Sequence, residues 1–314
     1  MEKDYCIELR DLVVHFPVRR GLVKAVDHVS VTFEEHQITG IIGESGCGKS
    51  VMGMAVLGLL PGYAKVCGEI LYGGRNLREL SPKQMRRLRG RQLGLIPQNP
   101  GDSLNPVRRI GGQIMEAAAL IGVKREEQKK QTADLLLRFG FEKNHLKRVE
   151  KAYPFELSGG MQQRALAAMG AASRPKWILA DEPSKGLDVE LRKQMYDTLR
   201  KMKNECVDSM LIITHDIALA RNLCDSVAVM YSGQIIEKGK DILENPKHPY
   251  TMGLMESLSE NGFKPMRGIA PAPGQDFSGC KFAPRCPWAK AECRKKPPEF
   301  YSLDDRIVRC FLYA

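Results

Sequence analysis

The stretch that decides the fold is Gln37–Leu60, with the sequence QITGIIGESGCGKSVMGMAVLGLL. It opens with a short apolar run of the kind found in buried strands, passes through a loop rich in glycine and continues into an apolar helical pattern. Pro61 and Gly62 follow, and both residues commonly end a helix. We therefore predict a buried strand, a glycine loop and a helix in direct succession.

The glycine loop, Gly43–Ser50, fits the phosphate-binding pattern G-x-x-x-x-G-K-[ST]. Its glycines allow backbone N–H groups to turn inward around phosphate oxygens. Lys49 is then expected to reach the β- and γ-phosphates of a nucleotide, and the hydroxyl of Ser50 to coordinate Mg²⁺. Cys47 stands at a free position of the pattern, where a small residue is tolerated. The expected nucleotide contacts in this stretch are Gly43, Glu44, Ser45, Gly46, Cys47, Gly48, Lys49, Ser50 and Val51.

A second element suited to phosphate chemistry is Lys176–Pro183, KWILADEP, an apolar strand that ends in two carboxylates. Asp181 is expected to hold Mg²⁺ through water, and Glu182 to orient and deprotonate the attacking water. An acidic pair at a strand end can also merely cap a turn. In a chain with a phosphate-binding loop, the catalytic interpretation is favoured.

A third stretch, Leu157–Arg164, LSGGMQQR, resembles the signature motif of the ABC ATPases. Other elements of that family then match as well: Gln98 in LIPQNP resembles the Q-loop, Ser184–Asp188 (SKGLD) the D-loop, and His215 in IITHD the switch histidine. All these motifs stand in the family's order over roughly residues 1–239. The chain is therefore identified as a member of the ABC ATPases.

The resemblance implies a head-to-tail dimer in which ATP lies between the phosphate loop of one subunit and the signature motif of the other. It implies that His215 contacts the γ-phosphate and that Gln98 connects this phosphate to the helical insertion, so both join Glu182 as catalytic residues. An aromatic side chain near the first strands stacks on adenine in the family, and Phe16 is the candidate. The further nucleotide contacts implied are Gln98, Ser158, Gly159, Gly160, Gln162, Asp181, Asp188 and His215, and the Mg²⁺ ligands are Ser50, Gln98 and Asp181.

The expected fold class is α/β, a P-loop ABC ATPase core in which strands and helices alternate. Alternating strands at 6–16 and 23–33 predict a β-rich N-terminal subdomain, and helical periodicity predicts an all-helical insertion at about 105–170. We place the ATPase domain at 1–245. The remainder, 246–314, is rich in Pro and Gly and is expected to be a small loop-rich C-terminal extension that contains cysteines.

The longest apolar run, Met52–Leu60, is too short to cross a bilayer, so a transported substrate is expected to pass through separate subunits. The formal charge of +11 suits nucleic acid, anionic lipid or a polyphosphate ligand without choosing among them. The segment Glu244–Leu258, which contains His-Pro-Tyr, resembles one found in importers of dipeptides, oligopeptides and nickel, and Gln98–Pro106 resembles their Q-loop region. We therefore expect a peripheral ATPase subunit on the cytoplasmic face of the cell membrane.

The resemblance implies as partners two integral-membrane permease subunits, a second ABC ATPase subunit, homologous or identical, and an extracytoplasmic substrate-binding protein, with no nucleic acid. Two alternatives remain: a soluble ABC ATPase that acts on nucleic acid, and the ATPase subunit of an exporter. The cargo, whether dipeptide, oligopeptide, nickel or another metal complex, is not encoded in this chain.

Four of the nine cysteines lie near the carboxy terminus, spaced C-x5-C-x6-C-x16-C: Cys280, Cys286, Cys293 and Cys310. Zinc sites usually contain paired C-x2-C steps, and this spacing has none. Four thiolates in a loop-rich segment can instead ligate a [4Fe–4S] cluster. Some members of the importer family carry such a cluster on a similar extension, which makes iron–sulfur the first expectation, zinc the second and free thiols the third.

Overall fold

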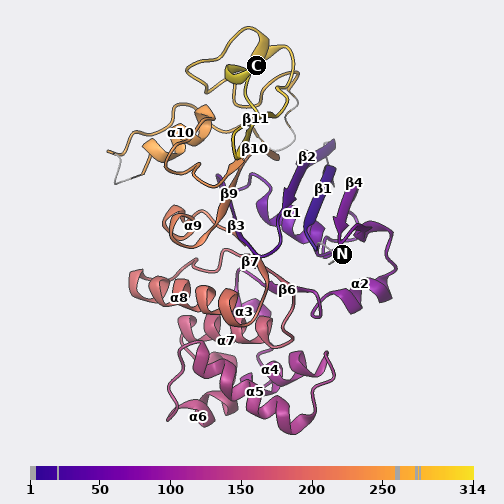
Figure 1. Cartoon of the computed structure of the whole chain (residues 1–314), viewed down its shortest axis with the longest axis vertical. Helices are drawn as coiled ribbons and strands as arrows, with labels where there is room; N and C mark the ends of the chain where they lie inside the picture. Colours follow the sequence, from indigo (N-terminus) through magenta and orange to yellow (C-terminus); the bar gives the residue numbers. More distant parts are fainter. Residues whose placement is uncertain (1–4, 20, 259–261, 273–274, 276) are drawn as a thin grey trace. The chain divides into compact units, whose positions relative to one another are not determined.

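The computed structural model describes residues 5–19, 21–258, 262–272, 275 and 277–314. The chain divides into two compact units (Figure 1). The first unit comprises Met1–Glu34, Thr39–Glu79 and Ala220–Ala314, and the second comprises Glu35–Ile38 and Leu80–Leu219. Each unit is therefore built from segments that are distant in the sequence.

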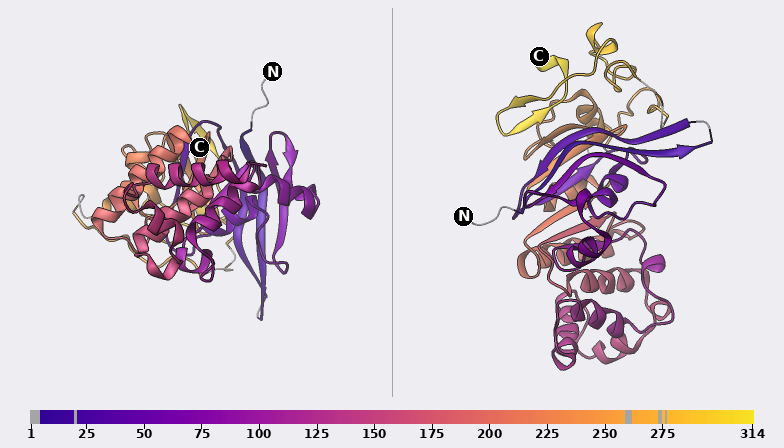
Figure 2. Two further views of the ribbon diagram at one scale, coloured as in Figure 1. Left: turned by 90° about the horizontal axis from the view of Figure 1, so that it is seen from below. Right: turned by 90° about the vertical axis from the view of Figure 1, so that its right-hand side faces the viewer.

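The first unit contains an antiparallel sheet with the strand order β2-β1-β4-β5. Its strands are β1 (Ile7–Val18), β2 (Gly21–Phe33), β4 (Lys65–Tyr72) and the short β5 (Arg75–Asn76), which leads into the 3₁₀ turn η1 (Leu77–Glu79). The long hairpin of β1 and β2 is the indigo ribbon in Figure 2. Alternate apolar residues of both strands are buried, as the sequence pattern predicted for this β-rich subdomain.

Parallel strands form the centre of the first unit. β3 (Ile38–Ile42) pairs in parallel with β9 (Ser226–Tyr231), and every residue of both strands is buried. β3 runs into the glycine loop and then into α1 (Lys49–Val56), so the predicted strand–loop–helix succession is confirmed. β9 turns back into β10 (Gln234–Gly239) to form the expected hairpin. Helix α9 (Ile217–Leu223) precedes β9.

The extension also belongs to the first unit and contains more regular structure than its Pro and Gly content predicts. After helix α10 (Pro249–Glu256), the chain forms the 3₁₀ turn η4 (Glu292–Arg294), the hairpin of β11 (Tyr301–Leu303) and β12 (Arg306–Val308), and a last 3₁₀ turn, η5 (Phe311–Tyr313). β12 pairs antiparallel with β10. The extension thus adds a hairpin to the sheet of the ATPase core, which the sequence pattern did not predict.

The second unit combines three parallel strands of the described chain with helices. β6 (Leu93–Ile96), β7 (Trp177–Asp181) and β8 (Ser209–Ile213) pair in that order, and β7 and β8 are buried throughout. Helices α3–α8 lie below β6 and β7 in Figure 1. Helices α4–α7 occupy the stretch in which the sequence pattern predicts a helical insertion. The bounds of the helices in this unit, with the short turns between them, are α2 (Pro82–Leu88), α3 (Pro100–Ser103), α4 (Ile110–Ala119), α5 (Arg125–Arg138), α6 (Leu146–Lys151), η2 (Pro154–Glu156), α7 (Gly159–Ala171) and α8 (Val189–Glu205).

Among the described residues, no helix is both long and apolar enough to span a membrane.

Candidate functional site

The glycine loop between β3 and α1 has a backbone that only glycine can supply at two positions. Gly43 and Gly48 have φ angles of 153° and 105°. A Cβ atom on Gly43 would lie 2.1 Å from the carbonyl oxygen of Met230, and one on Gly48 would lie 2.2 Å from that of Ala25. Both contacts are impossibly short, so any side chain at either position would displace the loop from the neighbouring strands.

The side chain of Lys49 crosses this loop. Its ammonium group donates hydrogen bonds to the carbonyl oxygens of Gly43, at 2.9 Å, and of Glu44, at 3.0 Å. Lys49 is buried although it is charged. The ammonium group also lies 3.8 Å from Sγ of Cys47. None of these three partners is an anion, so the loop presents positive charge to a ligand with phosphate groups.

A cavity of about 720 Å³ in the first unit adjoins the loop. Phe16 lines it, together with five of the other predicted nucleotide contacts: Glu44, Ser45, Gly46, Cys47 and Val51. Residues from the extension line the same cavity, which sequence reasoning did not anticipate: Ala270, Pro271, Gln275, Phe277 and Lys281. The volume is that of an ordinary small-molecule site.

In the second unit, the predicted residues Gln98, Asp181, Glu182 and His215 follow the carboxyl ends of adjacent parallel strands. Gln98 comes after β6, Asp181 ends β7, and His215 comes after β8. Carboxyl ends of parallel strands share one edge of a sheet, which is where ligands of α/β proteins bind. The structure thus brings these residues to the same edge of the sheet.

Glu182 and His215 are in direct contact. The Nδ1 atom of His215 lies 2.7 Å from Oε2 of Glu182. Because an ionised carboxylate can only accept, Nδ1 must carry the proton of this hydrogen bond. Glu182 also has a φ angle of 49°, in the left-handed region that non-glycine residues seldom occupy, and its N–H group donates to the carbonyl of Ile213 at 2.8 Å. Such strain, of order 1–3 kcal/mol, is concentrated at functional sites.

Asp216, which the sequence reasoning missed, directly follows His215 and forms a hydrogen bond with Ser184, two residues after Glu182. Its Oδ2 accepts hydrogen bonds from Tyr196 Oη, at 2.5 Å, and from Ser184 Oγ, at 3.3 Å, while Oδ1 accepts from the N–H of Leu219. Burial, followed by the hydrogen bond and charge of Asp216, raises the pKa of Tyr196, which keeps its hydroxyl a donor. A single Asp in the sequence gives no signal for this role.

The signature stretch begins helix α7. Ser158 is the N-cap, and its Oγ accepts a hydrogen bond from the N–H of Met161 at 3.4 Å. Gly159 and Gly160 are the first residues of the helix, and Nε2 of Gln162 donates to the carbonyl of Pro154 at 2.9 Å. A helix amino terminus with small residues presents N–H groups suited to an anion. Asp188 caps α8 in the same way, by accepting from the N–H of Leu191.

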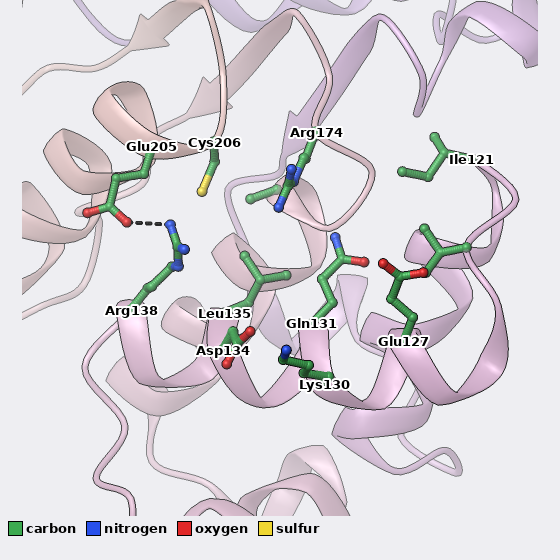
Figure 3. A pocket seen from close by; sticks show the side chains of 12 residues that line it. Ile121, Glu127, Lys130, Gln131, Asp134, Leu135, Arg138, Arg174, Glu205 and Cys206 are labelled. Atoms are coloured by element: carbon green, nitrogen blue, oxygen red, sulfur yellow. Dashed lines mark hydrogen bonds and ion pairs between the residues drawn. The ribbon is translucent and has the colours of Figure 1, made fainter.

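A further cavity of about 310 Å³ lies in the second unit beside α5 (Figure 3). A hydrogen-bonded ion pair between Arg138 and Glu205 stands at its side, next to Cys206. Among the described residues that line it are none of the predicted site residues. We therefore assign it no part in the nucleotide site.

All four carboxy-terminal cysteines line one small cavity of about 20 Å³, together with His248, Phe282 and other residues of the extension. Burial raises the pKa of Cys280 and Cys286, and that of Cys310 to about 11, so that the thiol form is favoured. In the described part of the chain, no group of three or more His, Cys, Asp or Glu side chains is arranged to hold a metal ion. The cavity has room for about one water molecule.

Residues 26–185 match the family model described as "ABC transporter", and residues 236–293 match "Oligopeptide/dipeptide transporter, C-terminal region". The chain belongs to the ABC transporter family. It is 38% identical to the dipeptide transport ATP-binding protein DppD of Haemophilus influenzae, over 97% of this chain and 94% of that protein. It is 37% identical to the oligopeptide transport ATP-binding protein OppD of Bacillus subtilis, over 98% and 88% of the two chains.

Solved structures support the fold of this ABC protein. The dimeric ATP-binding cassette MJ0796 bound to ADP and phosphate superimposes with a TM-score of 0.66 at 24% identity, over 74% of this chain and 98% of that one. The cbiO1 protein of Clostridium perfringens gives 0.64 at 24% identity, over 82% and 96%. With the family matches, these structures confirm the α/β ABC ATPase fold. The assignment as an ATPase subunit of an ABC importer is confirmed by the family matches and by the relatives DppD and OppD. The nucleic-acid and exporter alternatives gain no support.

Proposed function

We propose that this subunit binds ATP at Gly43–Ser50 and hydrolyses it to drive the import of dipeptides or oligopeptides. The observation that carries this proposal is the glycine loop, whose backbone excludes any side chain at Gly43 and Gly48 and whose Lys49 ammonium group contacts two carbonyl oxygens and the Cys47 sulfur, none of them an anion. Lys49 would leave those carbonyls to bind the β- and γ-phosphates. Phe16, which lines the adjoining cavity, would stack on the base.

We assign Glu182 the role of general base, because it lies at the edge of the sheet where β7 ends and is oriented by His215. His215 would contact the γ-phosphate. Mg²⁺, with Ser50, Gln98 and Asp181 as its ligands, would neutralise phosphate charge. These assignments follow from the family resemblance as well as from the sheet topology.

The signature residues Ser158, Gly159, Gly160 and Gln162, with Asp188, are proposed to act on ATP held by a second ATPase subunit. Ser158 and the first amides of α7 form a helix amino terminus, which favours a phosphate group. ATP would then hold two subunits together until hydrolysis releases them.

The test of nucleotide binding is Lys49→Ala, with Lys129→Ala on the exposed face of α5 as the matched control. Titration of the full-length chain with a fluorescent ATP analogue should show a large loss of affinity for Lys49→Ala only, because the phosphates lose the loop's cation. Equal affinities for the two variants would refute the assignment of the loop.

We propose that two integral-membrane permease subunits, a second ATPase subunit and an extracytoplasmic substrate-binding protein complete the importer, with this chain peripheral on the cytoplasmic face. The names of the relatives support peptides as cargo, and they give no support to nickel. Co-purification from membranes should recover two permeases and a second ATPase. Uptake of labelled dipeptides and of nickel by cells that carry or lack this gene separates the two cargoes.

We further propose that the four extension cysteines ligate a [4Fe–4S] cluster, with zinc as the second possibility. In its favour, four soft donors converge on one cavity, and the N–H of Lys290 lies 3.4 Å from Sγ of Cys293, as a donor to a ligating sulfur would. The thiols would have to deprotonate and move apart, since the cavity holds only one water. A bound cluster would supply folding free energy to the extension. We place the extension at 246–314 and the ATPase domain at 1–245.

Anaerobically purified protein tests the cluster. We expect brown protein with about four iron atoms per chain. Stoichiometric zinc without iron would establish the second possibility, and protein without either metal would refute both.

A further inference from the structure

The extension makes two direct contacts with Glu44, the second residue of the glycine loop. Nη1 of Arg285 donates to both carboxylate oxygens of Glu44, at 3.0 and 3.3 Å. The N–H group of Glu44 donates to the hydroxyl oxygen of Tyr250 at 3.1 Å. The side chain and the backbone of one loop residue are therefore both held by residues that lie more than 200 positions further along the chain.

Arg285 is held in place from its own side of this contact. Its side chain is only 7% exposed. Its Nε donates to the carbonyl of Arg267 at 3.1 Å, and its guanidinium lies over the rings of Tyr231 and Phe282, at 5.8 and 5.9 Å from their centres. A guanidinium that is buried, stacked and multiply bonded has little freedom left to lose, so its pairing with Glu44 is worth more than that of an exposed pair.

A second cation of the extension, Lys281, is linked to Cys47 of the glycine loop through the Ser232–Gly233 turn. Nζ of Lys281 bonds to Asp27, at 2.7 Å, and to the carbonyl of Ser232, at 2.8 Å. The next residue, Gly233, donates its N–H to the carbonyl of Cys47 at 2.8 Å. Burial opposes the ionised form of Asp27, but the hydrogen bonds of Lys281 and Lys24 lower its pKa to about 2, so this carboxylate is ionised at neutral pH. Burial lowers the pKa of Lys281, and the hydrogen bond and charge of Asp27 oppose that shift.

We propose that the extension is a working part of the nucleotide site, in which Arg285 acts through Glu44, and Lys281 through the Ser232–Gly233 turn, as positioning residues for the phosphate-binding loop. This inference rests on the proposed role of Gly43–Ser50. Arg285 fixes Glu44, whose carbonyl oxygen accepts a hydrogen bond from the ammonium group of Lys49.

The physical effect is preorganisation of the loop. With Glu44 held, the backbone N–H groups need no ordering when phosphate arrives. Without Arg285, the loop residue must be ordered at the moment of binding, and ordering one backbone residue costs a factor of about five to thirty in an equilibrium constant. The loss falls on ground state and transition state alike, so it raises KM and leaves kcat nearly unchanged.

The experiment compares Arg285→Ala, Glu44→Ala and the double variant in the full-length chain, by titration with a fluorescent ATP analogue. Each single variant should raise Kd about fivefold to thirtyfold, and the double variant should add no more than about twofold, because both changes break the same link. Arg285→Lys keeps a cation but not the planar fork, and its Kd should lie between those of wild type and Arg285→Ala. Hydrolysis by the reconstituted complex should show raised KM at near-normal kcat.

The control for removal of an extension cation is Lys296→Ala, because Lys296 is exposed and pairs with Glu292 inside the extension. If Lys49→Ala loses affinity but Arg285→Ala binds like Lys296→Ala, the inference is wrong and the loop assignment stands. If Lys49→Ala itself binds like wild type, the loop assignment fails first. A double variant whose loss equals the product of the single losses would refute the route through Glu44. General misfolding would instead lower the fraction of active protein and kcat at unchanged Kd.

Discussion

Replacement of Glu182 by glutamine isolates the chemical role of this side chain from its structural one. Glutamine has nearly the same shape, and its amide oxygen can accept the hydrogen bond that His215 now donates at 2.7 Å. The backbone contact of residue 182 with the carbonyl of Ile213 is also kept. What is lost is the negative charge and the ability to take a proton from water.

The size of the effect can be estimated from these contacts. A positioned general base contributes about a hundredfold to ten-thousandfold in rate, which corresponds to about 3–5 kcal/mol of barrier. The hydrogen bond to His215 passes from charged to neutral, which costs about 1 kcal/mol of stability. Glu182→Gln should therefore fold and bind MgATP with a Kd within about threefold of wild type, while kcat falls at least a hundredfold.

The assay is steady-state phosphate release by the reconstituted complex, with Kd measured separately on the subunit. Glu190→Gln is the matched control, because this acid is exposed in the first turn of α8 and loses the same charge. Turnover of Glu182→Gln equal to that of Glu190→Gln would remove Glu182 from the role of base. A fall in turnover explained by a parallel loss of ATP binding would also contradict the reasoning.

Three further predictions concern other parts of the subunit. Ser158→Arg should leave ATP binding to the isolated subunit within about twofold of wild type, yet abolish ATP-dependent dimerisation in size-exclusion chromatography, because a bulky cation replaces the small N-cap at a helix end suited to phosphate. Replacement of the four extension cysteines by serine should remove bound metal, measured by elemental analysis, and raise the Kd for ATP toward that of Arg285→Ala, while the core still folds. Burial lowers the pKa of His248 to about 3, so its contribution to stability is complete above its usual pKa near 6.5 and is lost as pH falls from there toward 3. The matched variant is His248→Asn, which keeps a side-chain acceptor for the N–H of Tyr250. Between pH 7.5 and 5.5, the free energy of unfolding of wild type should fall by about 1.4 kcal/mol more than that of His248→Asn. Urea unfolding followed by fluorescence measures this difference.

The parts of the site that the sequence predicts are those set by local pattern. The loop Gly43–Ser50 is specified by residues within eight positions, since its glycines, lysine and hydroxyl must follow a strand and open a helix. Glu182 and His215 end two apolar runs, and the topology of parallel strands then brings them to one edge. In each case a few adjacent residues contain the whole signal.

The contacts that the sequence does not predict join residues far apart in the chain. Arg285 lies 241 positions from Glu44, and Tyr250 lies 206 positions from it. The chain has many basic side chains, and the residues next to Arg285 in the sequence do not show whether it forms a buried ion pair or is exposed to solvent. The His-Pro-Tyr segment predicted the family of the extension, but the acceptor role of Tyr250 became visible only in the packed fold. The β11–β12 hairpin was not predicted because strands of three residues are too short to show an alternation of apolar and polar side chains.

The order of residues in the extension gives a physical reason for cysteines to matter to the nucleotide site. Lys281 directly follows Cys280, and Arg285 directly precedes Cys286. A segment with few regular elements cannot by itself fix two cations against the loop, because each ordered residue costs about 1–2 kcal/mol of backbone entropy. The pairing of β12 with β10 and the packing of the buried Phe282 supply part of the restraint. A metal held by the cysteines on either side of this pair of cations would supply the rest. Loss of the cysteines and loss of Arg285 should then converge on one measured property, the affinity for nucleotide, whereas loss of Glu182 changes the rate of hydrolysis and leaves that affinity intact.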